Sequence, residues 1–80
     1  MSHKKADLDN PHHVAAPMPG KVLRINVDLG AEVKIGESLL ITEAMKMENN
    51  VLSKIDGVVE EILHEEGTQV DIGDLLMIIK

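Results

Sequence analysis

The stretch GKVLRINVDLGAEVKIGESLLITE at residues 20–43 decides the fold, because GVVEEILHEEGTQVDIGDLLMIIK at residues 57–80 repeats it. The two copies align without a gap, nine of the 24 positions are identical, and all six glycines fall into three matched pairs. Such a repeat indicates two copies of one supersecondary unit. Each copy would present an apolar face that the other copy can bury.

Short runs of branched aliphatic residues alternate with polar turns that contain glycine in both copies. These runs predict strands at residues 22–27, 39–42, 58–63 and 75–79. The stretches 16–19 and 53–56 occupy equivalent positions and are expected to form the initial strand of each half. Turn glycines such as Gly30 and Gly67 are predicted to take positive φ. The expected fold is all-β, a flattened β-barrel or sandwich of two antiparallel halves related by a pseudo-two-fold axis.

Composition limits the classes of protein to which the chain can belong. Its 80 residues suffice for one small domain, predicted at residues 14–80 behind a flexible tail or linker at residues 1–13. The net charge of −6 and the absence of Phe, Trp and Tyr argue against nucleic-acid binding. No apolar run approaches the roughly 18 residues of a membrane span. The chain contains no cysteine, so nothing indicates disulfide bonds or an oxidising compartment. We therefore expect a soluble, cytoplasmic or otherwise intracellular protein whose partners are proteins.

The segment AMKMENN at residues 44–50 lies between the two copies and has no counterpart in the repeat. Its residues favour helix by propensity, but Met45 and Met47 are two residues apart and would not share a helix face. Strand-like residues on both sides favour a hairpin with Lys46 at its tip. A lysine at such a tip is usually only solvated, whereas exposed methionines on both sides of it suggest recognition by another protein.

Two registers are open for this hairpin. One register pairs Glu43 with Glu48 and places two like charges opposite each other. A shift by one residue instead pairs Ile41 with Val51. We prefer the second register, because it avoids the repulsion and joins two apolar side chains.

The sequence Glu43-Ala44-Met45-Lys46-Met47-Glu48 resembles the biotinylation motif of biotin carboxyl carrier domains, whose central lysine receives biotin in amide linkage. The stretch Ala16-Pro17-Met18-Pro19-Gly20 resembles a second motif of that family, at the spacing expected before the lysine. The resemblance covers roughly residues 14–80, and residues 5–20 further resemble carriers of the pyruvate carboxylase kind. The flattened two-halved barrel of this family agrees with the repeat.

The resemblance implies that biotin is attached covalently to Lys46. It also implies that a biotin protein ligase recognises the flanking residues Glu43, Ala44, Met45, Met47 and Glu48. The biotin would then carry a carboxyl group from a biotin carboxylase site to a carboxyltransferase site, with pyruvate as the acceptor if the likeness to pyruvate carboxylase holds.

Other carriers stay open as alternatives. An acyl-CoA carboxylase and an oxaloacetate decarboxylase use carriers of this kind. A lipoyl carrier shares the fold, but its lysine typically follows an acidic residue, whereas Lys46 follows Met45. An unmodified interaction module with the same fold is the third class.

No residues suggest catalysis by the chain itself. The serines lack a plausible base, and His12 and His13 are adjacent in the predicted tail without a third ligand, so we assign neither a catalytic residue nor a metal site. We expect a carrier that is not an enzyme by itself. Because residues 78–80 align with residues 41–43, pseudo-two-fold symmetry predicts both termini at the end of the domain opposite Lys46.

Overall fold

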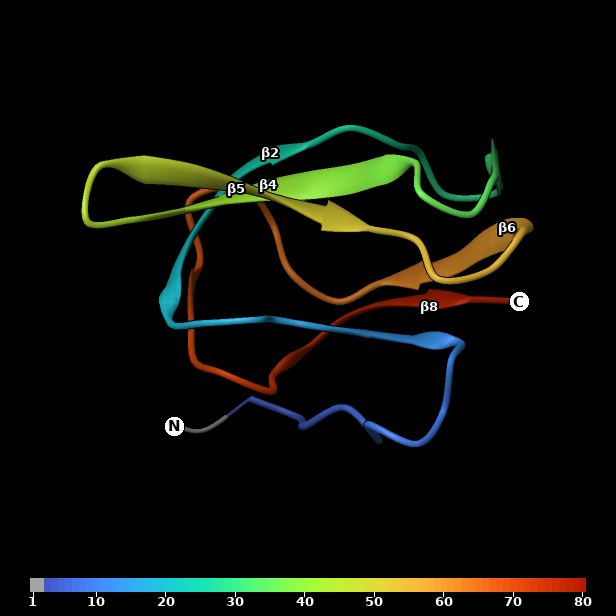
Figure 1. The fold of residues 1–80 in the computed structure, drawn as a ribbon, viewed down its shortest axis with the longest axis horizontal. Helices are drawn as coiled ribbons and strands as arrows, with labels where there is room; N and C mark the ends of the chain where they lie inside the picture. The colour runs from blue at the N-terminus through green and yellow to red at the C-terminus, as the bar shows by residue number, and fades with distance from the viewer. Residues whose placement is uncertain (1–2) are drawn as a thin grey trace.

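The computed structural model describes residues 3–80, and over that range it contains eight strands and no helix (Figure 1). The predicted all-β class is confirmed. Accordingly, the described range holds no helix that is long and apolar enough to cross a membrane. The strands are β1 (His13–Ala15), β2 (Gly20–Ile25), β3 (Glu32–Val33), β4 (Ser38–Ala44), β5 (Met47–Leu52), β6 (Gly57–Ile62), β7 (Gln69–Val70) and β8 (Leu75–Ile79).

The strands form two antiparallel sheets of four strands each, ordered β1-β8-β6-β3 and β5-β4-β2-β7. They make up the two layers seen in Figure 1, with β2, β4 and β5 in one layer and β6 and β8 in the other. The offset of 37 residues found in the sequence places β2 on β6, β3 on β7 and β4 on β8. The repeat is therefore visible in space as two sheets with equivalent strand orders.

Each sheet contains one short strand that comes from the other copy of the repeat. β3 pairs with β6, and β7 pairs with β2. Equivalent hydrogen bonds support the two exchanges: Val22 N donates to Thr68 O, and Val59 N donates to Ala31 O, each at 2.9 Å. The two halves are thus joined by backbone hydrogen bonds as well as by their apolar faces. The repeat alone does not predict this exchange, because strands of two residues are too short to produce a pattern of alternation.

The core lies between the sheets and is built from aliphatic residues of both copies. Many of its members are repeat partners, such as Val22 with Val59 and Leu39 with Leu76, and all four are at most 1% exposed. The cluster consists of Val14, Ala16, Val22, Val33, Leu39, Leu40, Val51, Val59, Val70, Leu76, Met77 and Ile79. Branched side chains of similar size on both inner faces allow the two sheets to pack closely without aromatic residues.

The matched glycines serve two different purposes. Gly30 and Gly67 have φ of 85° and 93°, which confirms the predicted positive φ in these turns. Gly20 instead permits a close approach, because a Cβ atom there would lie 2.6 Å from the carbonyl oxygen of Glu43. This contact fixes the start of β2 against the end of β4.

The initial strands predicted at residues 16–19 and 53–56 are wrong. Apart from the residue that follows the preceding strand, both stretches are bends, and they carry the chain from one sheet to the other. In the first stretch, Pro17 and Pro19 have no N–H to offer to a sheet. The strands that precede these bends are β1 and β5. The three residues of β1 correspond in the repeat to the last three residues of β5.

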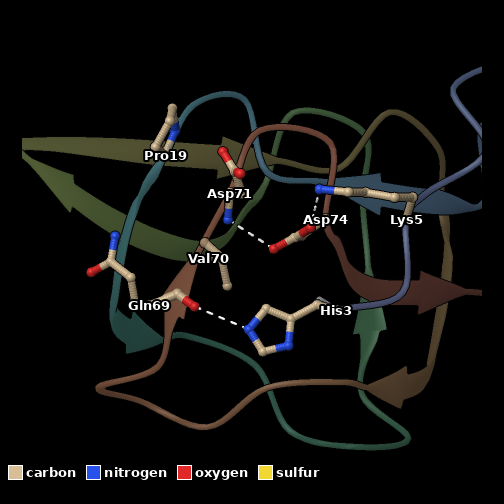
Figure 2. A pocket seen from close by; sticks show the side chains of 7 residues that line it. All are labelled: His3, Lys5, Pro19, Gln69, Val70, Asp71 and Asp74. Atoms are coloured by element: carbon tan, nitrogen blue, oxygen red, sulfur yellow. Dashed lines mark hydrogen bonds and ion pairs between the residues drawn. The ribbon is translucent and has the colours of Figure 1, made fainter. Parts of the chain in front are cut away.

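Residues 3–12, here called the N-terminal segment, lie against the turn that precedes β8 (Figure 2). Ala6 N donates to Gly73 O and Leu75 N donates to Lys4 O, both at 2.8 Å. A flexible tail at residues 1–13 stays a prediction for the chain in solution, and its first two residues lie outside the described residues. In the structure, contacts with the domain begin at residue 3, and β1 begins at His13, one residue before the predicted boundary.

Asp74 is the buried end of an ion pair that holds the N-terminal segment. Its Oδ1 lies 2.6 Å from Lys5 Nζ, and the two side chains are 1% and 55% exposed respectively. Burial alone would raise the pKa of Asp74, but the hydrogen bond from Asp71 N and the contacts with Lys5 hold that pKa below its ordinary value. Asp74 is therefore ionised at neutral pH and able to bind the lysine.

The two ends of the described chain lie in different places. The C-terminus lies at the end of the long axis opposite the β4–β5 hairpin, as predicted (Figure 1). The predicted domain start also lies beside the C-terminal strand, because Val14 pairs with Met77 and His13 with Ile78. The N-terminal segment before it turns back from β1 toward the hairpin end, and the first two residues of the chain lie outside the described residues. His3 Nε2 lies 3.1 Å from the carbonyl oxygen of Gln69, and Gln69 pairs with Lys21 beside β4. Symmetry could not predict this path, because the segment has no counterpart in the repeat.

Candidate functional site

The hairpin predicted between the two copies is formed by β4 and β5, and it protrudes at one end of the domain (Figure 1). Only Met45 and Lys46 connect the strands, and Ala44 pairs with Met47 across the turn. Met45 and Lys46 have φ of 53° and 65°. Positive φ at both central residues is characteristic of a type I′ turn, whose twist matches that of the two strands it joins.

The preferred register of this hairpin is wrong. The structure pairs Glu43 with Glu48, and Val51 lies opposite Leu40 instead of Ile41. A two-residue turn fixes the pairing of the residues that follow it, here as far as Leu40 and Val51, beyond which the register shifts by one residue. The repulsion between two carboxylates near water is only about 1 kcal/mol, and Lys21 lies on the other side of Glu43 as its partner from β2. Turn geometry therefore outweighs the unfavourable pair of charges.

The tip of the hairpin is strongly exposed. The side chain of Met45 is 94% exposed, that of Met47 is 66% exposed, and Lys46 is exposed between them. Within residues 3–80, Lys46 has neither an ion pair nor a side-chain hydrogen bond. The side chain of Lys46 is therefore accessible from outside the domain, and two large apolar side chains flank it.

The base of the hairpin is held by the stretch around Pro17 to Gly20. Asn49 of β5 lies with its Nδ2 at 3.5 Å from the Sδ of Met18, and Gly20 touches the carbonyl of Glu43. The two motifs that the sequence analysis singled out are therefore in contact in the structure. The bend supports the hairpin on one side without covering the lysine.

The contact between Met18 and Asn49, and the pairing of Lys21 with Glu43, were not among the predicted site features. The position of Lys21 at the start of a strand could have been predicted from the repeat, because Lys21 directly follows Gly20, which is matched by Gly57 in the second copy. Nothing in the sequence indicates the contact of Met18, because it depends on the path of the bend between the sheets.

His12 and His13 point to different partners. His12 Nδ1 lies 2.6 Å from the carbonyl oxygen of Ile79, and His13 Nδ1 accepts a hydrogen bond from Asp7 N at 3.0 Å. Over the described residues there is no group of three or more His, Cys, Asp or Glu side chains that could hold a metal ion. Both histidines thus help to fix the N-terminal segment.

A family model and several curated relatives agree on the family of this chain. The family model described as "Biotin-requiring enzyme" matches residues 12–79. Pyruvate carboxylase of Staphylococcus aureus is 45% identical over 76 residues, which cover 95% of this chain and 7% of that protein. The biotin carboxyl carrier protein of Streptococcus mutans is 42% identical over 64 residues, which cover 80% of this chain and 49% of that protein.

Among solved structures, the urea carboxylase of Kluyveromyces lactis superposes with a TM-score of 0.81 at 29% sequence identity. The match covers 100% of this chain and 7% of that one. The chain thus spans a small part of the large enzymes it matches, and about half of the small carrier protein. The predicted likeness to carrier domains of the pyruvate carboxylase kind and the predicted flattened two-halved fold are both confirmed.

Proposed function

Because the chain belongs to the family of biotin-requiring enzymes, as one of its biotin carboxyl carrier domains, we propose that Lys46 is the residue to which biotin is attached. The observation that carries this proposal is the position of Lys46 at the second central residue of a two-residue turn, exposed and without an ion pair in the described chain. The other lysines lie in the N-terminal segment, in β2, in the connections between strands or directly after β8. No other lysine has that position at a protruding tip.

The residues at the tip fit the attached group. An amide forms when the amine of Lys46 condenses with the carboxyl group of biotin and one molecule of water is lost. The ligase must enclose the lysine to bring these groups together, and a turn of two residues offers it a narrow tip with open space around it. We infer that Met45 and Met47 provide apolar contact for the ligase, and that Glu43, Ala44 and Glu48 complete the surface it recognises.

The bound biotin would supply the group that accepts and releases a carboxyl, and the protein would supply position. The two left-handed residues hold the amide at the far end of a rigid pair of strands. A carrier of this kind that is tethered to its partners would hold the group at both partner sites at an effective concentration of about millimolar. The domain itself then needs no catalytic residue, which agrees with a carrier that is not an enzyme by itself.

We propose a biotin carboxylase and a carboxyltransferase of the pyruvate carboxylase type as partners, because the matching pyruvate carboxylase is 45% identical over 95% of this chain. Acyl-CoA carboxylases stay an alternative, since a propionyl-CoA carboxylase alpha chain is 35% identical over 92% of this chain. The intracellular location expected from the sequence stays a prediction.

The test is the intact mass of the chain after incubation with a biotin ligase, ATP and biotin. We expect a gain of one biotin minus one water in the wild type and in Lys54→Arg, a matched exposed lysine, and no gain in Lys46→Arg. Peptide mapping should locate the modification at Lys46, and Lys46→Arg should keep the same thermal midpoint. Labelling of Lys46→Arg would refute the assignment, and modification by a lipoate ligase alone would identify a lipoyl carrier.

A further inference from the structure

An open apolar groove lies beside the hairpin, where β1 and β5 face each other. Its volume is about 430 Å³. The residues that line it are Leu8, Ala15, Ala16, Pro17, Asn50, Val51, Leu52, Lys54, Ile72 and Gly73. Three of the large apolar side chains among them are well exposed: Leu8 is 74% exposed, Ile72 is 60% exposed and Leu52 is 50% exposed. Apolar groups gathered in this way on a small domain are typical of a surface that another molecule covers.

One wall of the groove is the edge strand β5. This strand pairs only with β4, so its other edge is open. Ala44 and Met47 close the turn, and hydrogen-bonded pairs alternate along an antiparallel ladder from there. The backbone N–H and C=O groups of Glu48 and Asn50 therefore face the open edge, and Asn50 also lines the groove. An extended peptide can pair with such an edge.

The groove differs in charge from the rest of the domain. The chain contains 14 Asp and Glu residues, yet none of them lines the groove. Asp7 and Asp9 flank Leu8 in sequence, and their carboxylates lie outside the lining. The one charged residue of the groove is Lys54, which has no ion pair within residues 3–80. This lysine also lines a smaller hollow next to the groove.

The domain already binds one extended segment in a comparable way. Residues Lys4 to Ala6 pair with the turn before β8 through backbone hydrogen bonds, and Lys5 makes an ion pair with the buried Asp74. Backbone pairing and one ion pair with a buried carboxylate thus hold this segment of the chain against the domain. In the groove the charges are reversed, because the domain contributes the lysine.

We propose that this groove is a docking site for an extended peptide segment of a partner protein, with apolar side chains on one face and a carboxylate that meets Lys54. The segment would add a strand to β5 and place its apolar side chains against Leu52 and Ile72. Leu52 is six residues from Lys46 along the strand, which corresponds to about 20 Å at 3.3 Å per residue. Docking would therefore hold the domain and leave the tip free.

The test is a titration of the 15N-labelled chain with a peptide, followed through the NMR signals of the backbone amides. The labelled chain carries Lys46→Arg, so that no modification of Lys46 interferes. The probe is the peptide Ac-TVTVTE-NH2, whose two Val and one Glu share one face of an extended strand, and the matched peptide Ac-TVTVTK-NH2 reverses the charge. We expect the acidic peptide to shift the amide signals of Asn50, Leu52 and Ile72 and to bind at least fivefold more tightly than the basic one. Methylation of alternate backbone nitrogens of the acidic peptide should abolish binding, because it removes the pairing with β5.

Variants of exposed groove residues provide the controls. Leu52→Glu and Lys54→Glu should each weaken binding of the acidic peptide at least fivefold. Ile35→Glu should leave it unchanged, because Ile35 is the repeat partner of Ile72, is 68% exposed and lies outside the groove. In a chain that retains Lys46, Leu52→Glu should still accept biotin in the ligase assay, so that failure of this proposal and failure of the biotin assignment give different results.

Three results would overturn the proposal. The first is the absence of shifts at millimolar peptide, and the second is equal binding of the acidic and basic peptides. The third is a concentration-dependent shift of the same amides without peptide, which would identify a second copy of the chain as the occupant.

Discussion

Thr42 is the clearest case in which one substitution should stabilise this domain. Its side chain is 0% exposed in β4, and Oγ1 has no hydrogen-bond partner among the described residues. The repeat partner of Thr42 is Ile79, which is 1% exposed in the equivalent strand β8. The second half of the domain thus uses an aliphatic side chain at the position where the first half buries an unpaired hydroxyl.

The expected gain follows from that comparison. A buried polar group without a partner costs about 1–3 kcal/mol, and Thr42→Val replaces the hydroxyl by a methyl group of similar size. We expect the free energy of unfolding to rise by about 1 kcal/mol, which corresponds to about 4–8 °C in the thermal midpoint of a domain this small. Ile79→Thr creates the same defect in the other half and also loses apolar volume, so it should destabilise by about 2–4 kcal/mol.

The assay is thermal unfolding followed by circular dichroism, since the chain has no Trp or Tyr for fluorescence. Thr42→Ser is the matched control, because it keeps the hydroxyl and loses only the methyl group, and it should lower the midpoint. Biotinylation of Thr42→Val should be unchanged, because this side chain faces the core. A midpoint for Thr42→Val at or below that of the wild type would refute the reasoning and show that the hydroxyl is satisfied.

Three further predictions follow from the turns and the N-terminal segment. Gly20→Ala should destabilise the domain by about 2 kcal/mol, because the added methyl group overlaps the carbonyl of Glu43, and it should also slow biotinylation. The control is Gly57→Ala at the repeat partner of Gly20, which should affect stability alone. Equal biotinylation rates of the two variants would argue against a supporting role for Gly20. Gly67→Val should destabilise by about 1–3 kcal/mol because φ is 93° there, as thermal unfolding will show. The lowered pKa of Asp74 means that its contribution to stability is complete above the ordinary value of 3.8 and is lost as the pH falls through the lower folded-state value. The protection factor of Ala6 N–H, which corrects for the intrinsic exchange rate at each pH, should therefore fall only at strongly acidic pH. A fall in this protection factor near neutral pH would contradict the ion pair.

The repeat made most of the fold predictable from the sequence. Identical residues such as Val22 and Val59 marked the inner faces, and turn glycines such as Gly30 marked the ends of the strands. These features are local or symmetric, so one sequence is enough to detect them. The hairpin could be predicted for a related reason, since the spacing of Met45 and Met47 is incompatible with a helix face.

The features that the sequence did not predict depend on tertiary geometry. The register of the hairpin follows from a turn in which Met45 and Lys46 both have positive φ, and neither residue type favours that conformation. Residues 16–19 resemble a strand in the alignment but cross between sheets. The path of the N-terminal segment depends on the pairing of Lys5 with Asp74, two residues that are 69 positions apart.

The departures from symmetry coincide with the proposed functional surfaces. Where the two halves agree, the residues build sheets, turns and core, and a carrier with only these features would have no distinguished lysine. The first half differs from the second by the tip at Met45 and Lys46, which provides the proposed attachment site. The groove likewise exists because Ala15 of β1 is small where its repeat partner Leu52 of β5 is large and exposed. Substituting Ala15 by Leu should therefore fill the groove and abolish peptide binding while Lys46 still accepts biotin, and unchanged peptide binding would show that the peptide contacts β5 from the other side.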